Sequence, residues 1–510
     1  MFRRLLPALP YLLLMWVWWQ GWGAPALEDD RFWWIPQALD VYERGPVLIP
    51  AGPLPKVLLP EEISPLQVPP QWSGGIPDYA HPPLFYWYLA SWMKLLGPSM
   101  HSIQLGLLVL ALLGMMGFLR LVQRVTSPAW AVGGGLLLPL VPVISVQLSR
   151  ADLDMALFCL TPWALDALLA RRYLRFMGLS LLAVWCKEPG VLLASAVLPC
   201  VWQERGGRRW WALVAMLSPF GSLLAWGLLH WWLTGWGLAG TERLPSSLWG
   251  WIRDLQQVAQ FVLLEQGRFW LLPCLFAAVW RLWRTRSLPL LILGLHLLTH
   301  LAFFGTVNFL GGDPNRIAGG HLRYLVPAWI SFLAICLAGS VPLKEFAQRI
   351  LTHAFGPHSV ITSKLMTSLL WGLCASFAWL DWHAPPTGGV ERNFFAHDLV
   401  TAHQSLLPKL EQALQARRQV WVGSYAWIEL SLPILAGDAN TLEGLKWYGQ
   451  STRPDELPIG AWVLVSAHGE PLGTLEHALE FKTLERVQVG SAWAELREVE
   501  GHHHAPSRRE

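Results

Sequence analysis

The sequence predicts a mainly helical, polytopic membrane protein of about eleven helices with a small extracytoplasmic α/β domain near its C-terminal end. Three observations support this fold class. Only 14% of the 510 residues are charged, whereas ordinary soluble proteins carry about 25%. The stretches 5–19, 106–118 and 288–304 contain no Asp, Glu, Lys or Arg, and with their flanks they reach the length of a membrane span. After about residue 383 the composition becomes that of a soluble protein.

The positions of the basic residues give the predicted topology. If Arg3 and Arg4 are cytoplasmic, every short loop assigned to the inside is basic, as the positive-inside rule requires. The N-terminus is then cytoplasmic and the C-terminal domain extracytoplasmic. The expected helices cover residues 5–24, 101–119, 128–148, 155–170, 176–186, 189–203, 210–234, 269–283, 288–307, 324–342 and 365–381.

Two of these helices, 176–186 and 189–203, are too short to cross a full bilayer alone. We expect them to form a tilted or partial hairpin whose tip is Lys187-Glu188-Pro189. Non-helical backbone at membrane depth is tolerated only where it lines protein or a wet cavity. The pattern therefore predicts that Lys187 and Glu188 lie near the outer half of the membrane and face something polar.

The chain divides into three predicted regions. These are a transmembrane domain over 1–382 with a large extracytoplasmic loop over 25–100, a soluble extracytoplasmic α/β domain over 383–500, and a disordered tail over 501–510. Within the soluble domain, hydrophobic periodicity favours a helix over 396–418 and strands over 420–423, 461–466 and 492–499. The net charge of +3 gives no indication of a nucleic-acid partner.

The first outer loop carries the most informative polar residues. Glu28-Asp29-Asp30-Arg31 directly follows the first helix, in a chain with few charges. Adjacent carboxylates at a membrane surface repel one another and lose solvation, so they suit general-base catalysis or the binding of a divalent metal ion. The alternative is a solvated helix terminus with no special role. No cysteine or histidine spacing predicts a metal site elsewhere.

A second motif in the same loop indicates a family. The runs are Asp29-Asp30-Arg31-Phe32-Trp33-Trp34 and His81-Pro82-Pro83-Leu84-Phe85-Tyr86-Trp87. In type, order and position they resemble the motifs of GT-C class integral membrane glycosyltransferases. The likeness is greatest to the branch of protein O-mannosyltransferases, bacterial aminoarabinose transferases and related undecaprenyl-phosphate-sugar enzymes. The similarity covers residues 1 to about 342. The second acid of the pair is Asp30 where the family usually has Glu, and several relatives have Lys in place of His81.

The resemblance implies an enzyme of the bacterial inner membrane that moves a sugar from a polyprenyl-phosphate donor to an acceptor hydroxyl at the extracytoplasmic face, with inversion. Asp29 would be the base, and Asp30 would orient it or share a metal; an alternative register makes Asp30 the leading acid. The acceptor can be a protein, a lipid or a glycan. The residues expected at the donor phosphate and substrate are His81, Asp154, Lys187, Arg323 and Tyr324.

Each cationic candidate also has a simpler reading. Arg323 can be an interfacial side chain, Lys187 can pair with Glu188, and His81 can be a packing residue of the loop. Asp166, inside a predicted helix, is expected to form a structural ion pair near the inner end of that helix. The alternative function for the whole chain is a polytopic transporter or lipid flippase, although no internal repeat is visible.

Overall fold

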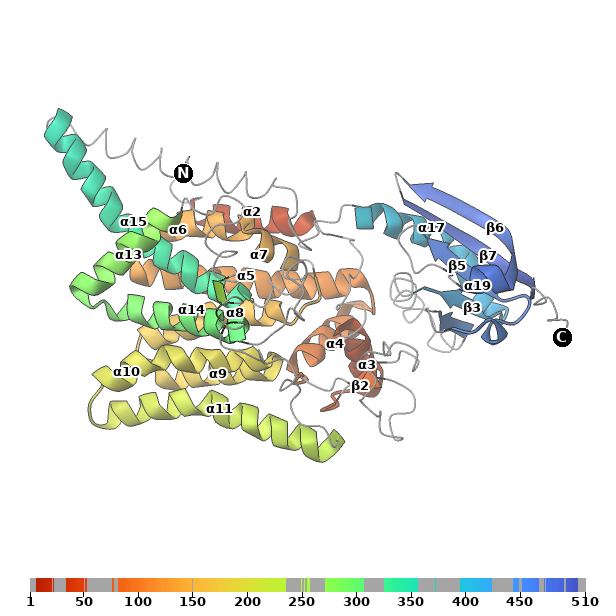
Figure 1. Cartoon of the computed structure of the whole chain (residues 1–510), viewed down its shortest axis with the longest axis horizontal. Coiled ribbons are helices and arrows are strands. Elements are labelled where there is room, and N and C mark those ends of the chain that lie inside the picture. Colours follow the sequence, from red (N-terminus) through yellow and green to blue (C-terminus); the bar gives the residue numbers. More distant parts are fainter. Residues whose placement is uncertain are drawn as a thin grey trace.

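The structure is a computed structural model with a helical bundle and a separate mixed sheet (Figure 1). It describes residues 6–20, 22, 34–49, 51–52, 76–77, 81–148, 150–234, 249, 252, 255–256, 271–306, 325–355, 372, 395–423, 444–448, 452–466, 472, 474–489 and 492–502. All structural statements below refer to these residues.

The bundle contains a helix within each of the first ten predicted spans, whereas the eleventh, 365–381, lies outside the described residues except for position 372. Its elements are η1 (Leu6–Ala8), α2 (Leu9–Trp19), α5 (Met100–Val125), α6 (Pro128–Leu137), η6 (Leu138–Leu140), α7 (Pro142–Gln147), α8 (Asp154–Leu169), α9 (Tyr173–Cys186), η7 (Glu188–Val197), α10 (Leu198–Gln203), α11 (Gly207–Thr234), α13 (Leu272–Thr285), α14 (Leu288–Thr306) and α15 (Val326–Phe355).

Two predicted helices differ from the expectation of simple α-helices. The span 128–148 is interrupted by η6 and by the extended residue Val141, which precedes Pro142. The span 189–203 begins as the 3-10 helix η7 and becomes α-helical only at α10. Proline explains both interruptions, because it lacks the backbone N–H that continues an α-helix and restricts the residue before it.

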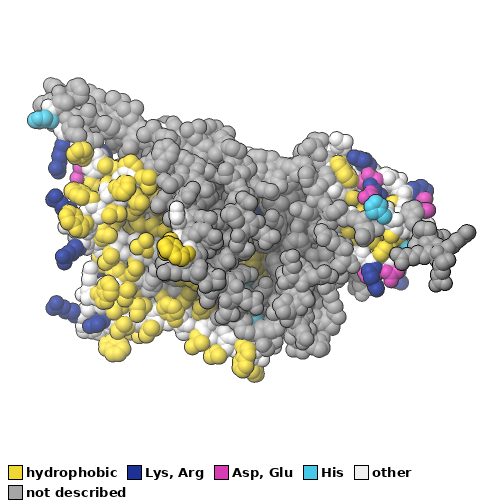
Figure 2. All heavy atoms as spheres, viewed as in Figure 1, with side chains coloured by type: hydrophobic (Ala, Val, Ile, Leu, Met, Phe, Trp, Pro, Cys, Tyr) yellow, Lys and Arg dark blue, Asp and Glu magenta, His cyan; other side chains and the backbone are white. Residues whose placement is uncertain are grey.

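The bundle has the surface of a membrane protein. Helices α5, α11 and α15 contain segments long and apolar enough to cross a membrane. Helix α11 exposes Trp210 and Trp211 in its first turns and Trp231 and Trp232 in its last, as expected where aromatic side chains mark both membrane interfaces. Figure 2 shows hydrophobic side chains over this face of the bundle and basic side chains gathered at the end far from the sheet.

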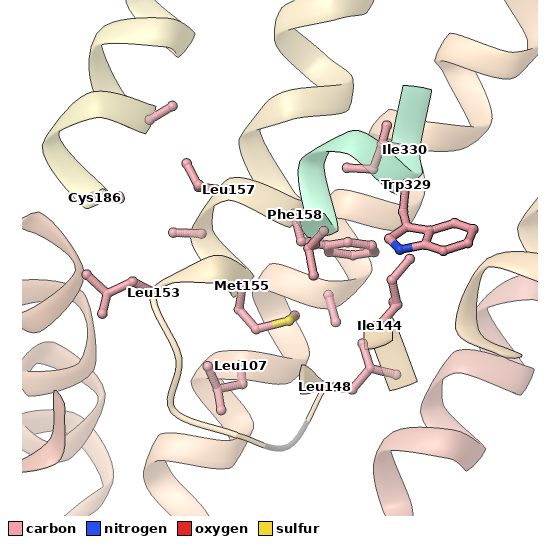
Figure 3. Packing of buried hydrophobic residues seen from close by; sticks show 14 of the residues in the cluster. Leu107, Ile144, Leu148, Leu153, Met155, Leu157, Phe158, Cys186, Trp329 and Ile330 are labelled. Carbon is pink, nitrogen blue, oxygen red and sulfur yellow. The ribbon is translucent and has the colours of Figure 1, made fainter. Parts of the chain in front are cut away.

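The centre of the bundle is built on close packing between α5 and α8. A Cβ added to Gly114 of α5 would lie 2.6 Å from the ring of Phe158 in α8, so glycine is what allows the two helices to approach. Phe158 is fully buried, and Met155 and Trp329 are buried beside it (Figure 3). This packing fixes α8, whose first residue is Asp154.

The predicted outer loop over 25–100 contains two helices that the sequence analysis did not identify. They are α3 (Ile35–Arg44) and α4 (Leu84–Leu96), which pack against each other at the end of the bundle that faces the sheet (Figure 1). Short strands β1 (Ala51–Gly52) and β2 (Ile76–Pro77) pair antiparallel. Ile35, Ala38 and Leu39 of α3 are buried. The polar residues Gln37 and Asp40 are buried as well, so α3 is enclosed along most of its length.

The C-terminal part is a five-stranded mixed sheet in the order β4-β3-β5-β7-β6. The central strand β5 runs parallel to β3 and antiparallel to β7. Helix α17 packs on β6 and β7 through buried residues that include Leu406 and Leu410. The bounds are α17 (Phe395–Gln415), β3 (Val420–Val422), β4 (Leu445–Trp447), η12 (Pro454–Glu456), β5 (Trp462–Ser466), α19 (Thr474–Ala478), β6 (Leu479–Val489) and β7 (Ala492–His502).

The helix and three strands predicted for this region are therefore present, and β4 and β6 are additional. Strand β7 continues to His502, so Gly501 and His502 belong to the sheet and not to the tail to which the sequence analysis assigned them. Pairing with β6 explains this extension, because His502 lies opposite Leu479.

Candidate active site

A buried ion cluster lies where α8 begins and α9 ends. The ammonium of Lys187 is 2.7 Å from Asp154 Oδ2 and 3.9 Å from Asp152 Oδ1, and all three residues are almost fully buried. The backbone N–H of Asp154 donates to Asp152 Oδ1 at 3.2 Å, which holds the two carboxylates together. The formal charges of this cluster, two carboxylates and one ammonium, sum to one negative charge.

The backbone around Lys187 explains how a lysine reaches this position. Lys187 is extended, with φ −161° and ψ 136°, between the end of α9 and the start of η7. Its N–H donates to Ala183 O, and its carbonyl accepts from Gly190 N–H, both at 2.9 Å. A Cβ on Gly190 would lie 2.5 Å from the carbonyl carbon of Ala183, so the turn requires glycine there. Of the predicted non-helical tip, Lys187 is therefore non-helical, whereas Glu188 and Pro189 already belong to the 3-10 helix η7.

A side-chain hydrogen bond joins this tip to the first outer loop. The Nδ1 atom of His81 is 2.8 and 3.0 Å from the two carboxylate oxygens of Glu188. Both side chains are about one-fifth exposed. The suggested pairing of Lys187 with Glu188 is therefore wrong: each finds its partner on a different element. Because Glu188 directly follows Lys187, two consecutive residues connect the buried cluster to His81.

The ring of Trp34 packs on His81. The ring of Trp34, which precedes α3, has its centroid 5.0 Å from that of His81 and stacks on Tyr86 at 6.5 Å. Within the Pro-Pro-Leu motif, Pro83 caps α4, Tyr86 is buried, and Trp87 Nε1 donates to Val47 O at 2.8 Å. The motif thus fixes α4 against α3 and places His81 at the ion pair.

The remaining predicted site residues lie outside the described residues. These are Asp29, Asp30, Arg323 and Tyr324. The gathering of the acidic pair and of Arg323 around Lys187 is therefore still a prediction. Among the described residues, His81, Asp154 and Lys187 do lie in one region, because Glu188 connects His81 to Lys187 and Lys187 contacts Asp154.

Two residues of this region were not predicted to act there, namely Asp152 and Trp34. The signal for Asp152 was the Asp-Leu-Asp spacing at the end of an apolar span, and the signal for Trp34 was the aromatic run after the acidic pair. Among the residues that the structure describes, no group of three His, Cys, Asp or Glu side chains has the arrangement of a metal site.

Asp166 forms the structural ion pair that was predicted for it. Its Oδ1 accepts from Arg124 Nε at 2.7 Å, and Arg120 Nε lies 3.8 Å from Oδ2. Both arginines belong to the last turns of α5, at the opposite end of α8 from Asp154. Asp166 therefore stabilises the α5–α8 contact and has no connection with the candidate site.

The fold of the whole chain matches solved membrane glycosyltransferases. ArnT from Cupriavidus metallidurans bound to undecaprenyl phosphate aligns with a TM-score of 0.57 and 15% identity, over 96% of this chain and 97% of that chain. The apo state of the same ArnT gives 0.55 and 14% over the same shares. The apo oligosaccharyltransferase of Archaeoglobus fulgidus gives 0.50 and 12%, over 90% of this chain and 69% of that one.

The sequence itself matches no protein-family model and no curated protein. The aligned structures are GT-C glycosyltransferases. The chain therefore has the GT-C fold, with membrane helices and a small C-terminal sheet, as the motifs of the first outer loop predicted.

Proposed function

We propose that this chain transfers a sugar from a polyprenyl-phosphate donor to an acceptor hydroxyl at the extracytoplasmic end of its helical bundle. The observation that carries the proposal is the coincidence of the GT-C fold with the buried Asp152–Asp154–Lys187 cluster and the His81–Glu188 pair at one end of the bundle. In a chain with few charges, a buried group of this kind inside a membrane bundle is expected to serve function.

In the proposed reaction the acceptor oxygen attacks the anomeric carbon, the bond from that carbon to the phosphate oxygen breaks, and polyprenyl phosphate leaves. A carboxylate accepts the proton of the hydroxyl. By its resemblance to the family, Asp29 is the proposed base for a single inverting displacement, with Asp30 next to it. In the sequence Asp30 precedes Trp34 by four residues, and the ring of Trp34 packs on His81.

Charge develops on the departing phosphate, so cationic groups near it lower the barrier. We assign this role to Arg323 and Lys187, with Tyr324 donating a hydrogen bond and His81 donating one from Nε2 in its protonated form. Lys187 is held by Asp154 and Asp152, which orient its ammonium toward them. In this proposal Asp154 positions Lys187 and takes no proton itself.

The test uses the purified full-length chain, a panel of radiolabelled undecaprenyl-phosphate sugars, and extracted membranes as the source of protein, lipid and glycan acceptors. We expect label to pass from one donor to an acceptor fraction, and the rate to fall at least a hundredfold in Asp29→Asn. An equal or larger loss in Asp30→Asn with little change in Asp29→Asn would make Asp30 the base. A chelator arm measures any need for a divalent ion.

The same variants separate the enzyme from a transporter or flippase. In sealed vesicles, translocation of the labelled lipid that persists in Asp29→Asn, without transfer of label to any acceptor, would contradict the proposed function. The identity of the labelled fraction then names the acceptor class.

A further inference from the structure

Helix α3 buries polar atoms that find no partner in the fold. Gln37 is fully buried, and within the part of the chain that the structure describes neither its Oε1 nor its Nε2 has a hydrogen-bond partner. The indole Nε1 of Trp34 is likewise buried without one. Buried polar groups in folded proteins are almost always satisfied, so three unsatisfied atoms on two neighbouring side chains require an explanation.

These atoms lie beside the candidate active site. Residues three apart on a helix are neighbours on one face, so the side chain of Gln37 lies next to that of Trp34. The ring of Trp34 packs at 5.0 Å on His81, which binds Glu188. The unsatisfied amide is therefore one helical turn from Trp34, whose ring packs on a residue that the proposed function places at the donor.

The other polar residues of α3 do not share this property. Asp40, one turn beyond Gln37, is bound by Arg44 through two hydrogen bonds. The polar side chain at the far end of α3 thus has a hydrogen-bond partner within the helix, whereas the polar atoms at the end next to His81 have none among the described residues. A leucine would fill the space of Gln37 without the desolvation of an amide, so the amide is not required for packing.

We propose that Gln37 and Trp34 form the subsite for the sugar of the polyprenyl-phosphate donor, which rests on the proposed function. A sugar hydroxyl both donates and accepts, and therefore matches a carboxamide and an indole N–H together. An aromatic ring also packs on the C–H face of a pyranose. Of the three parts of the donor, the phosphate requires cationic partners and the polyprenyl chain has no polar atoms. The subsite therefore suits a neutral hydroxyl or amino group of the sugar.

The experiment measures the binding of bare undecaprenyl phosphate and of undecaprenyl-phosphate hexoses to the purified full-length chain. The wild-type chain, Gln37→Leu and Trp34→Phe are compared. Gln104→Leu serves as the matched control, because Gln104 is also a fully buried glutamine and lies on another helix, α5. Thermal unfolding of each variant is recorded in the same detergent.

We expect the wild type to prefer one sugar-bearing lipid over the bare lipid phosphate. The ratio of the affinity for the sugar-bearing lipid to that for the bare lipid should fall about tenfold in Gln37→Leu and about threefold in Trp34→Phe. These changes correspond to the loss of one or two hydrogen bonds. Affinity for the bare lipid should stay within about twofold, and Gln37→Leu should unfold at the same or a higher temperature. The control should keep the preference.

An unchanged preference in Gln37→Leu would overturn the inference, as would an equal loss of affinity for both lipids or a wild type without any preference. A raised KM for the acceptor with an intact donor preference would also overturn it, because the amide would then bind the acceptor. A wild-type chain that transfers no sugar overturns the proposed function, whereas intact transfer together with an unchanged preference in Gln37→Leu overturns only this subsite.

Discussion

Lys187 shows how a single charged residue can be kept inside a membrane bundle. Its ammonium is buried, and two carboxylates from the start of α8 lie within 4 Å of it. Removal of an ion from water costs several kcal/mol even in a relaxed protein interior, on the order of the whole stability of a small domain. The attraction between the partners offsets this cost only while all of them are present.

The first prediction follows from that balance. Asp154→Leu leaves the ammonium of Lys187 with the more distant Asp152, and we expect a loss of about 3–5 kcal/mol in stability. The triple variant Asp152→Leu, Asp154→Leu and Lys187→Met removes all three buried charges, and should be more stable than the single variant while remaining inactive in transfer. Thermal unfolding followed by tryptophan fluorescence measures the two stabilities. A triple variant less stable than the single one would contradict the prediction.

The second prediction concerns Glu188, whose bond to His81 is the described link between the outer loop and the buried cluster. Both side chains are about one-fifth exposed, and a side-chain hydrogen bond contributes about 0.5–1.5 kcal/mol to stability. We therefore expect Glu188→Gln to unfold near the wild-type temperature but to transfer sugar about tenfold more slowly, since His81 and Trp34 lose their fixed position. Steady-state transfer rates measure the effect.

Glu204 provides the matched control for Glu188. It lies just beyond α10, and its Oε1 accepts from Arg171 Nη1 at 2.7 Å. Glu204→Gln removes a comparable ion pair at the other end of the η7–α10 segment, far from His81. Transfer by this variant should equal that of the wild type at a temperature where both are folded. Equal slowing in both variants would mean that the segment, and not the His81 contact, controls the rate.

At the scale of the element, the turn from α9 into η7 depends on one glycine. A Cβ on Gly190 meets the backbone of Ala183, which cannot move without unwinding α9. We predict that Gly190→Ala shifts η7, displaces Lys187, and lowers both the unfolding temperature and the transfer rate. Gly178, also on α9, has open space around its Cα. Gly178→Ala should therefore leave transfer unchanged and raise stability by up to about 1 kcal/mol.

The hairpin of α9 and η7 also shows what a sequence reveals. Lys187 and Glu188 were predicted at its tip because a charge pair inside an apolar stretch has few places to lie. Their partners were not predicted, since Asp154 and His81 are 33 and 107 residues away from them in the chain. Such pairings arise from tertiary packing, and a single sequence holds no signal for them.

The first outer loop was misjudged for a different physical reason. Its many Pro and Gly residues suggested irregular structure, yet α3 and α4 pack there as helices. The amphipathic pattern of α3 covers only ten residues, too few to stand out beside apolar spans of twice that length. The unsatisfied state of Gln37 is likewise visible only in three dimensions, because a glutamine on a short helix normally faces water.

At the scale of the whole molecule, the basic side chains, the helices of the first outer loop and the C-terminal sheet indicate the same orientation in the membrane. Basic side chains gather at one end of the bundle (Figure 2), whereas α3, α4 and the C-terminal sheet lie toward the other (Figure 1). By the positive-inside rule we propose that the basic end is cytoplasmic and that the candidate site and the sheet lie outside. The proposed transfer to a secreted acceptor requires this orientation.

This orientation predicts the outcome of cysteine labelling. Ile459 is 65% exposed on the sheet domain, and Arg208 is exposed in the first turn of α11. In intact cells, a membrane-impermeant maleimide should label Ile459→Cys once the outer membrane is permeabilised, and should label Arg208→Cys only after the inner membrane is lysed. The wild-type chain is the background control, because four of its five described cysteines are buried and the fifth, Cys274, is partly so. Labelling in the reverse order would invert the topology and place the His81–Glu188 pair in the cytoplasm, where the proposed reaction does not occur.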